Sequence, residues 1–592
     1  MKKKISIYLL AVLSVFVQYS CSNFLEEEIK SEVTSEYYKT KKGMESLVTA
    51  SYSFLRFGVT GEDGYIIREL GTDCFTEGGD GGYRKSYNRY EASLDPQNGA
   101  VYSIWDNHYR AINTVNMGLE LMPQLAADDA FKKKKTAELR FLRANFYFDL
   151  VQQYGAIPVN TEAFWTVKTD FKRSPVTDVY KLIIDDLRYA VDNLPETGTE
   201  SGYATTYAAS HLLSKVYLTR GSAVTEQRGQ KPSDMDSVIY YGNKVVESGI
   251  FSLEKNFSDV FDINNRNSSE FIFSVQFTAD EIFNEGGNKM HLYYVSVYEN
   301  FPGMLRDVEN GRAWKRARPT DFSLYELFDS KNDARLYKSF QWVYKANNPS
   351  TIPVWKTITD TNGNVIFTPD PELEGKPKFQ LGDTAVCFVP YPMELSESEM
   401  EKYRASKPYE FFPLNMQTEL YYPTLSKWLD PNRPSPNEAA GTRNWVKMRL
   451  SETYLMLAEA YGRKNDFDKA AEYINIIRSR AAYKENEYRP DWAGENGTLA
   501  STETGMKVTP SEISKNFVDF MLDESGREFL GEIRRWEDLV RCEKLVERVK
   551  AHNKEAAPNI KEYHKLRPIP QNHIDRLDPV GPMSEEQNEG YY

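Results

Sequence analysis

The sequence predicts a mostly α protein: a tetratricopeptide-like scaffold of helix pairs that carries a loop-rich, hairpin-containing binding region. Three observations lead to this fold class. Apolar residues recur at helical spacing through residues 105–248, one helix–turn–helix unit near the C-terminus has tetratricopeptide spacing, and the segment between them is rich in Pro, Gly, Tyr and Trp. We therefore expect a rigid helical frame that supports long loops.

The first segment of the chain has the pattern of an export signal. Lys2–Lys4 form a basic start, and Ile5–Val17 form an apolar run that is shorter than the roughly 20 residues a membrane-spanning helix needs. Ser20 then precedes Cys21, as at the cleavage site of a bacterial lipoprotein signal, although Gln18 stands where leucine is usual. We interpret residues 1–20 as a lipoprotein signal peptide and Cys21 as the acylated residue, with an ordinary secretory signal as the alternative.

The charge of the chain argues against nucleic acid as a partner. The 592 residues have a formal charge of −13, and removing residues 1–20, which contain three lysines and no acid, lowers it to −16. A chain this acidic repels phosphate backbones. Beyond the signal, Cys74, Cys387 and Cys542 are scattered singly, so the sequence offers no cysteine-based zinc site and at most one disulfide.

The helices of the first half are predicted from apolar stripes and end signals. Pro175 suits the first turn of a helix and Ser174 its N-cap, while Gly155 and Pro195 are helix stops. The predicted helices are 105–121, 135–154, 176–194, 207–220 and 235–248.

Residues 251–445 have a different character. Residues 270–277 alternate like a strand, and Asn362-Gly363 between two apolar runs is a strong hairpin signal. One short helix is expected over 321–328. The remainder is predicted to be loops, which is where binding sites usually lie.

The helix pair follows this region, in RLSETYLMLAEAYGRKNDFDKAAEYINIIRSRA. Ala458 and Ala470 are the small residues that let two helices approach closely, and Tyr454, Leu457 and Ile474 are bulky neighbours. One such unit cannot bury its own apolar face, so it needs the earlier helices as neighbours.

Catalytic motifs are missing from the sequence. It contains no Gly-x-Ser-x-Gly, no phosphate-binding loop and no His-Glu-x-x-His, and its six histidines lack metal-ligand spacing. His211 is expected to be a packed helix residue, and Asp185-Asp186 a solvated pair. We predict no enzyme activity, no metal and no cofactor.

Aromatic residues are instead dense in loops, and tyrosine is the most frequent aromatic, with 39 residues. Three patches stand out: GYRKSYNRY from residue 82, HLYYVSVYENFPGMLRDVENGRAW from 291, and PYEFFPLNMQTELYYPTLSKW from 408. Aromatic rings next to Arg, Asn and Asp suit a sugar, because the rings stack on the pyranose and the polar groups bind its hydroxyls. Peptide binding and ordinary loop packing are the alternatives for the same residues.

A series of short motifs over nearly the full chain resembles the SusD/RagB family of nutrient-binding lipoproteins. One departure is Ser525-Gly526-Arg527 after Glu524, where the family often has Glu-Arg. The matching segments are, in order, Cys21 with its acidic tail, Trp105-x-x-x-Tyr109-x-x-Ile112, Glu138-x-Arg140 running into Tyr154-Gly155, Asp185-Asp186-Leu187, Arg318-Pro319-Thr320, Arg449-Leu-x-Glu452-x-Tyr454, Arg535-Trp536-x-Asp538, Pro568-Ile569-Pro570 and Asn588-x-Gly590-Tyr591.

The resemblance implies a lipid-anchored protein on the outer face of the outer membrane. It would act as the lid of a SusC-like TonB-dependent transporter and bind an oligosaccharide, or a peptide in the RagB branch, without chemistry. The implied organisation is a single SusD-like domain over 21–592, made of an acidic tether (21–40), an N-terminal helical part (41–250), the irregular region (251–445) and a C-terminal helical part and tail (446–592).

The resemblance places the ligand site in the loops before Trp105 and before Arg318-Pro319-Thr320, which coincide with two of the three aromatic patches. The candidate ligand-binding residues are Tyr65, Asp80, Tyr83, Arg84, Tyr87, Tyr298, Phe301 and Trp314. Two alternative functions remain: a surface glycoside hydrolase, which would need two carboxylates facing each other in a cleft, and a protein-interaction scaffold, because helix-pair repeats often bind peptides.

Overall fold

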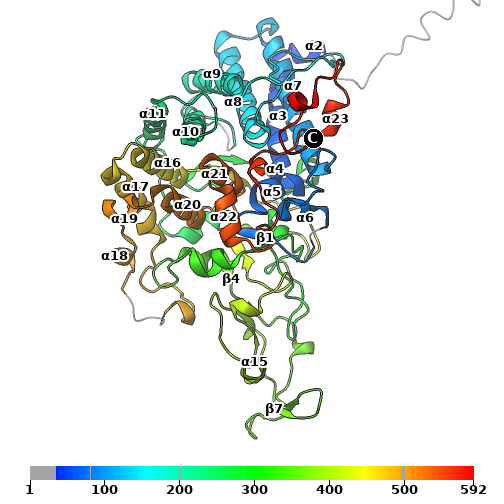
Figure 1. Ribbon diagram of the computed structural model, residues 1–592, viewed down its shortest axis with the longest axis vertical. Coiled ribbons are helices and arrows are strands. Elements are labelled where there is room, and N and C mark those ends of the chain that lie inside the picture. Colours follow the sequence, from blue (N-terminus) through cyan, green and yellow to red (C-terminus); the bar gives the residue numbers. More distant parts are fainter. Residues whose placement is uncertain (1–34, 81, 199–201, 285, 495–499) are drawn as a thin grey trace, which may run out of the picture.

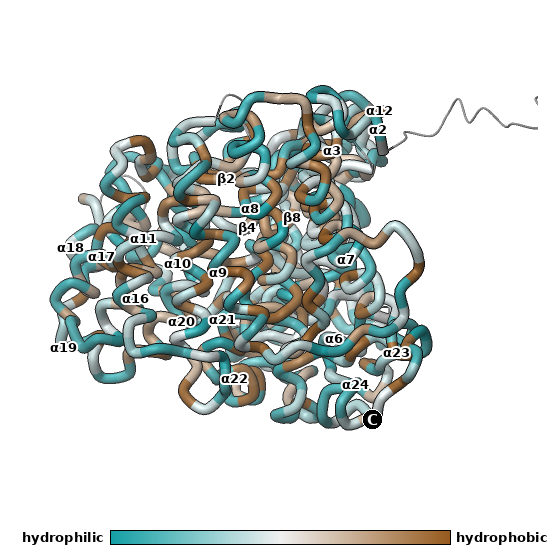
Figure 2. Tube along the Cα trace, turned by 90° about the horizontal axis from the view of Figure 1, so that it is seen from above, coloured by the Kyte–Doolittle hydropathy of each residue, from teal (hydrophilic) through white to brown (hydrophobic). Residues whose placement is uncertain are grey.

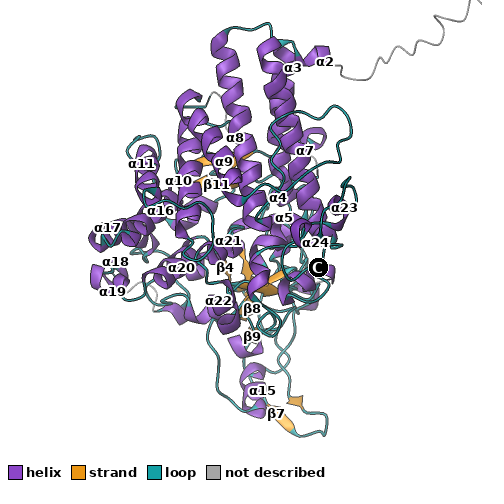
Figure 3. Ribbon diagram, turned by 45° about the horizontal axis from the view of Figure 1, so that its top comes forward, coloured by secondary structure: helices purple, strands orange, loops and turns teal. Residues whose placement is uncertain are grey.

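The computed structural model describes residues 35–80, 82–198, 202–284, 286–494 and 500–592. A helical body occupies most of the molecule, and a loop-rich extension that contains α15 and β7 projects from one end of it (Figures 1 and 3). The N-terminal helices are α2 (Ser35–Tyr38), α3 (Lys41–Ser53), α4 (Phe57–Thr60), α5 (Glu62–Glu69), α6 (Lys85–Arg89), α7 (Gly99–Leu121), α8 (Asp129–Tyr154), α9 (Val176–Asn193), α10 (Thr206–Ser222) and α11 (Asp234–Val246).

The C-terminal helices follow the same body. They are α16 (Leu450–Arg463), α17 (Phe467–Ala481), α18 (Glu503–Met506), α19 (Pro510–Ser514), α20 (Phe517–Glu528), α21 (Arg535–Arg541), α22 (Leu545–His552), α23 (Gln571–Ile574) and α24 (Met583–Glu586). The predicted helices are thus confirmed, with ends that differ by up to six residues. The helix after Gly155 has Pro175, not Ser174, as its N-cap residue.

The long helices form one continuous stack. Each of α7, α8, α9, α10 and α11 packs on the next, and α11 packs directly on α16, which pairs with α17. The predicted close approach of the last pair is confirmed, since Ala458 and Ala470 are both fully buried. More than 200 residues of sequence separate α11 from α16. The two helices still pack together, because each helix pair needs a neighbour to cover its apolar face. Figure 2 shows the apolar residues gathered between the stacked helices.

The irregular region contains short strands and short helices. The Asn362-Gly363 hairpin is confirmed as the β6–β7 pair, with Gly363 at φ 86°. The predicted helix over 321–328 is one π-helical turn, η5 (Phe322–Glu326). The α-helices described in this region are α12 (Glu281–Asn284), α13 (Met290–Tyr293), α14 (Arg335–Ser339) and α15 (Glu397–Ala405).

The strands form small sheets of two or three members. β11 pairs antiparallel with β2 and so ties the irregular region to the start of α16. The strands are β1 (Phe75–Glu77), β2 (Phe271–Val275), β3 (Ala317–Pro319), β4 (Phe340–Gln341), β5 (Val343–Lys345), β6 (Ile358–Thr359), β7 (Val365–Phe367), β8 (Thr384–Phe388), β9 (Glu410–Phe412), β10 (Thr424–Leu425) and β11 (Trp445–Arg449).

Buried ion pairs join these elements. Arg143 on α8 donates both Nε and Nη2 to Asp186 on α9, at 2.8 and 2.9 Å. Asp186 is therefore a buried partner between helices, and the expectation of a solvated pair holds only for Asp185 beside it. His211 is confirmed as a packed residue, because its ring bonds Thr453 at 2.9 Å in the interior.

Candidate ligand site

The candidate site lies where the chain leaves the β1–β3 pair. The two strands pair antiparallel, and beyond them the Gly78 amide donates to the Arg316 carbonyl at 3.1 Å and the Asp80 amide to the Lys315 carbonyl at 3.2 Å. These bonds extend the ladder into two loops. They bring Asp80 and the Trp314–Arg316 segment side by side, although they are more than 230 residues apart in the sequence.

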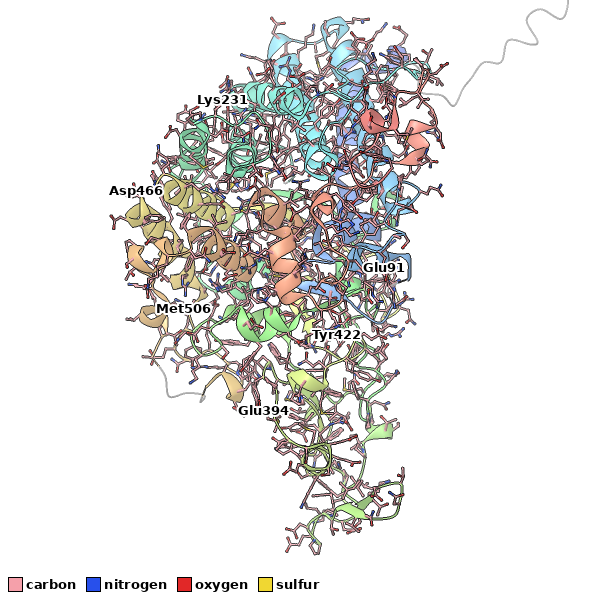
Figure 4. The ribbon with its side chains drawn as sticks, in the orientation of Figure 1. Glu91, Lys231, Glu394, Tyr422, Asp466 and Met506 are labelled. Carbon is pink, nitrogen blue, oxygen red and sulfur yellow. The ribbon has the colours of Figure 1, made fainter. Side chains whose placement is uncertain are left out.

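Glycine is required at position 78 by this close approach. A Cβ atom there would lie 2.4 Å from the Lys315 carbonyl oxygen and 3.3 Å from the hydroxyl of Tyr422. Tyr422 is buried at the junction between the helical body and the extension (Figure 4). The junction therefore packs directly against the loop that carries Asp80.

The Trp314 segment is also fixed from its other side. Trp314, Lys315 and Arg316 donate their amides to the carbonyls of Leu292, Val295 and Tyr293, at 3.3, 3.1 and 2.8 Å. Lys315 adopts a left-handed conformation with φ 49°, which costs a non-glycine residue roughly 1–2 kcal/mol. Strain of this kind persists where the surroundings hold it, and it often marks functional sites.

Five side chains converge at this point, and we call them the Trp314 cluster: Glu62, Asp80, Arg84, Trp314 and Arg316. The Arg316 Nε donates to Glu62 at 3.0 Å, and its guanidinium also pairs with Asp80 and lies 5.1 Å from the centre of the Trp314 ring. Arg84 forms an ion pair with Glu62. The charges of the two carboxylates and the two guanidinium groups cancel. The indole of Trp314 is partly exposed.

The arrangement keeps these groups available for a ligand. Burial and the neighbouring Arg316 charge lower the pKa of Arg84 to about 10, so this guanidinium remains protonated at neutral pH. The Asp80 side chain is 53% exposed, whereas that of Glu62 is 16% exposed. The cluster therefore presents an aromatic surface, an accessible acceptor and donors held in fixed positions, and such groups can bind the ring and hydroxyls of a sugar.

Five of the eight predicted residues lie in the segments of this cluster. Asp80, Arg84 and Trp314 contribute side chains to it. Tyr65 lies in α5, the helix of Glu62, and Tyr83 lies in the 3-10 turn η2 (Gly82–Arg84).

The other three predicted residues are packed in the interior. Tyr87 is fully buried and donates its hydroxyl to Asn98 at 2.9 Å. Tyr298 is fully buried, stacks on Tyr344 at 5.1 Å between ring centres, and donates to the Gly311 carbonyl at 2.7 Å. Phe301 is half-buried and packs against Phe412 and Tyr421. In this conformation the Tyr87 and Tyr298 rings present no surface to a ligand.

Sequence reasoning missed Glu62 and Arg316. Arg316 carried a usable signal, because it stands two positions after Trp314 in a segment leading into a strand, where alternate residues share a face. Glu62 carried no such signal. It meets Arg316 across 254 positions of sequence, and only the packing of α5 on the loops brings them together.

Other predicted features have separate outcomes. Cys21 and the signal peptide lie outside the described residues. The described part of the chain contains no group of three or more His, Cys, Asp or Glu residues placed to hold a metal ion, and Cys74, Cys387 and Cys542 are free thiols. In the same part, no helix combines the length and apolar character needed to cross a membrane.

Glu69, at the end of the helix that carries Glu62, should give the fold a measurable pH dependence. Its side chain is fully buried, one oxygen accepts from the Arg534 amide at 2.9 Å, and burial raises its pKa to about 8. The folded protein therefore keeps a proton that the unfolded chain loses near pH 4.5. The contribution of Glu69 to the free energy of unfolding is fully present below about pH 4.5 and declines as the pH rises to 8.

We accordingly expect Glu69→Gln to gain stability relative to the wild type as the pH rises from 5 to 8. Urea unfolding of both proteins across this range measures the difference. The exposed Glu45→Gln is the control and should follow the wild type. If the free energies of unfolding of Glu69→Gln and the wild type change in parallel with pH, Glu69 does not have the raised pKa described above.

Comparison with known proteins places the chain in a family. The sequence model of the SusD family matches residues 185–591, and a model described as starch-binding and associating with the outer membrane matches residues 23–218. The chain belongs to the SusD family. The resemblance seen in its motifs is thus confirmed, and the proteins of this family are non-catalytic binding proteins.

Relatives from the SusD family match different lengths of this chain. SusD-like protein P25 of Formosa agariphila is 25% identical over 99% of this chain and 100% of its own length, and a SusD-like protein of Bacteroides ovatus is 31% identical over 29% of this chain and 32% of its own length. Among solved structures, a SusD homolog from Bacteroides thetaiotaomicron has a TM-score of 0.65 at 19% identity, covering 94% of this chain and 98% of its own. A laminarin-binding SusD-like protein has a TM-score of 0.63 at 19% identity, covering 94% of this chain and all of its own. These structures share the fold, so the predicted mostly α architecture is confirmed.

Proposed function

We propose that this SusD-family protein captures oligosaccharides at the cell surface through the Trp314 cluster and delivers them to a SusC-like TonB-dependent transporter. The observation that carries the proposal is the partly exposed Trp314 ring, which lies 5.1 Å from Arg316, whose guanidinium also pairs with the exposed carboxylate of Asp80. An indole next to fixed donors and acceptors offers stacking and hydrogen bonding together, as sugar recognition requires.

Two properties of the cluster support binding without a change in the ligand. Glu62 and Asp80 are both paired with Arg316, so neither is a free acid or base in this conformation. The loops are fixed by main-chain hydrogen bonds before any ligand arrives, and a preformed site loses less entropy on binding.

Titration calorimetry with defined ligands tests the proposal. Laminarin oligosaccharides are the first choice because a structural relative binds laminarin, and starch oligosaccharides follow from the family description. We expect saturable binding and an unchanged oligosaccharide on chromatography afterwards. Release of shorter products would favour a hydrolase, and binding of peptides but no glycan would favour the RagB-like alternative.

The surface location has its own test in Cys21. If this cysteine is acylated, Cys21→Ser should move the protein from the outer-membrane fraction to the soluble fraction, because acyl chains supply its attachment. Immunoblots of fractionated cells and labelling of intact cells measure the result. Replacing a later cysteine, as in Cys387→Ser, is the matched control. Normal surface display of Cys21→Ser would refute the lipid anchor while leaving glycan binding untouched.

A further inference from the structure

A cleft lies along α7, separate from the Trp314 cluster. It has a volume of about 520 Å³, and α7, the loop that follows α8 and the C-terminal segment around α23 form its walls. Figure 1 shows α23 beside α7. None of its lining residues belongs to the Trp314 cluster. Its volume falls in the range of small-molecule sites, which are commonly 300–1,000 Å³.

The interior of this cleft, which we call the α7 cleft, is aromatic. The Trp105 ring lies 4.8 Å from both Tyr109 and His573, and His573 is followed by Phe171 at 6.4 Å between ring centres. Phe164 packs against Phe171 at 5.4 Å. Tyr109, Phe164, Phe171 and His573 are partly exposed and form an aromatic surface contributed by three separate parts of the chain, whereas Trp105 is buried against it. Such a surface can take the apolar face of a flat or ring-shaped ligand.

Hydrogen bonds fix the walls of the α7 cleft. Tyr109 donates its hydroxyl to the Pro158 carbonyl at 2.8 Å, and Asn113 exchanges bonds with the main chain of Phe164 at 2.8 and 3.3 Å. The amide of Asp578 donates to the Thr169 carbonyl at 3.1 Å and so attaches the C-terminal segment to the same loop. The cleft is thus preformed and needs little ordering to bind a ligand.

The charges that line the cleft are mainly positive, in a protein whose net charge is −13. The cations are Arg110, Lys168 and Arg576, and the one lining carboxylate, Asp106, lies 3.8 Å from Arg110. The Lys168 ammonium stands 5.3 Å from Phe164 and 5.7 Å from Phe171, at the edge of the aromatic surface. Lys168 forms an exposed ion pair with Asp170 at 3.9 Å, which lies outside the lining of the cleft, whereas among the described residues no ion pair joins Arg576 to a carboxylate. A ligand with a ring and a negative charge would meet both features at once.

We propose that the α7 cleft is a second carbohydrate site that takes an acidic sugar, with a uronate ring on the aromatic surface and its carboxylate between Lys168 and Arg576. A short acidic oligosaccharide meets both the aromatic rings and the cations of the cleft, whereas an extended peptide usually needs a sheet edge or a long groove. The proposal does not depend on the Trp314 cluster. Two sites on one chain would also raise the avidity for a long polysaccharide that reaches both.

Titration calorimetry with tetragalacturonate, compared with the neutral maltotetraose, tests the α7 cleft. The double variant Lys168→Ala/Arg576→Ala should bind tetragalacturonate roughly tenfold more weakly, as expected for the loss of two partly exposed charge contacts. Phe171→Ala should also weaken binding, whereas Trp314→Ala should leave it unchanged. The double variant Lys42→Ala/Lys133→Ala removes the same charge from exposed residues outside the cleft and is the matched control.

Any one of the following results would overturn this proposal. They are the absence of any tetragalacturonate binding at millimolar concentration, equal affinity for maltotetraose, equal weakening in the two double variants, and full competition by tetraglutamate. Loss of tetragalacturonate binding in Trp314→Ala alone would also overturn it, by assigning the acidic ligand to the Trp314 cluster. Failure of the neutral glycan to bind at the Trp314 cluster would affect only the proposed function.

Discussion

Replacing Trp314 by alanine is expected to weaken glycan binding by roughly 1–3 kcal/mol, or about 5- to 150-fold in affinity. The indole is the only large aromatic side chain of the Trp314 cluster, and it is partly exposed while its backbone is fixed on both sides. Truncation removes the stacking surface but leaves Asp80, Arg84 and Glu62 in place. Calorimetry with the glycan identified in the ligand screen measures the change.

Trp165 offers a matched control for this variant. It is 49% exposed, donates its indole nitrogen to Glu120 at 3.1 Å, and lies outside the Trp314 cluster. Trp165→Ala should therefore keep the affinity of the wild type. If Trp314→Ala also keeps that affinity but melts at a lower temperature, the ring serves packing, and the Trp314 cluster is not the glycan site.

The helical frame was predictable because its signals are local. Apolar stripes, small residues at Ala458 and Ala470, and glycine at position 155 act within one or two turns of helix, and the structure places each as expected. The stacking of α11 on α16 follows from the same rule, since every helix pair must cover its apolar face.

The candidate site was only partly predictable, because tyrosine identity does not distinguish a binding residue from a core residue. Tyr87 and Tyr298 came from the same aromatic patches as Arg84 and Trp314, but both hydroxyls find partners inside the protein, at Asn98 and the Gly311 carbonyl. A buried hydrogen bond makes tyrosine acceptable in a core. The sequence does not reveal such partners when they come from other segments.

The burial of charged residues was also only partly predictable from the sequence. Asp186 is buried with Arg143 on the preceding helix, α8, although beside it Asp185 pairs with Lys181 at the surface. Adjacent positions on a helix point in different directions, so one acid of a pair can enter an interface while the other remains in water. Which of the two does so depends on the neighbouring helix, whose position the local sequence does not give.

Glu528→Gln should destabilise the fold by about 3–5 kcal/mol, because it removes the shared partner of three buried arginines. At the end of α20, Glu528 is fully buried and accepts from Arg449 at 2.7 Å and from Arg335 at 3.1 Å, and it also pairs with Arg480. Gln keeps the shape of the side chain but not its charge, so the arginines would remain buried with less compensation. Urea unfolding at pH 7 measures the loss.

The pH dependence of this network gives an independent check on the same prediction. Burial alone would raise the pKa of Glu528, but Arg480, Arg449 and Arg335 outweigh it and hold that pKa well below the ordinary value. Because the folded pKa is depressed, the stabilisation is present above about pH 4.5 and is lost as the pH falls toward the folded pKa. The wild type should therefore lose stability steeply between pH 4.5 and 2.

The free energies of unfolding of the wild type and Glu528→Gln should then become equal in acid, since the variant has already lost the stabilisation that the Glu528 charge provides. Glu472→Gln is the matched control, because Glu472 forms an exposed pair with Lys469 at 2.7 Å, and such pairs contribute about 0–1 kcal/mol. A loss at pH 7 for Glu528→Gln no larger than that of Glu472→Gln would show that the buried arginines do not depend on Glu528. If the difference in the free energy of unfolding between Glu528→Gln and the wild type stayed constant down to pH 2, the effect would come from packing and not from charge.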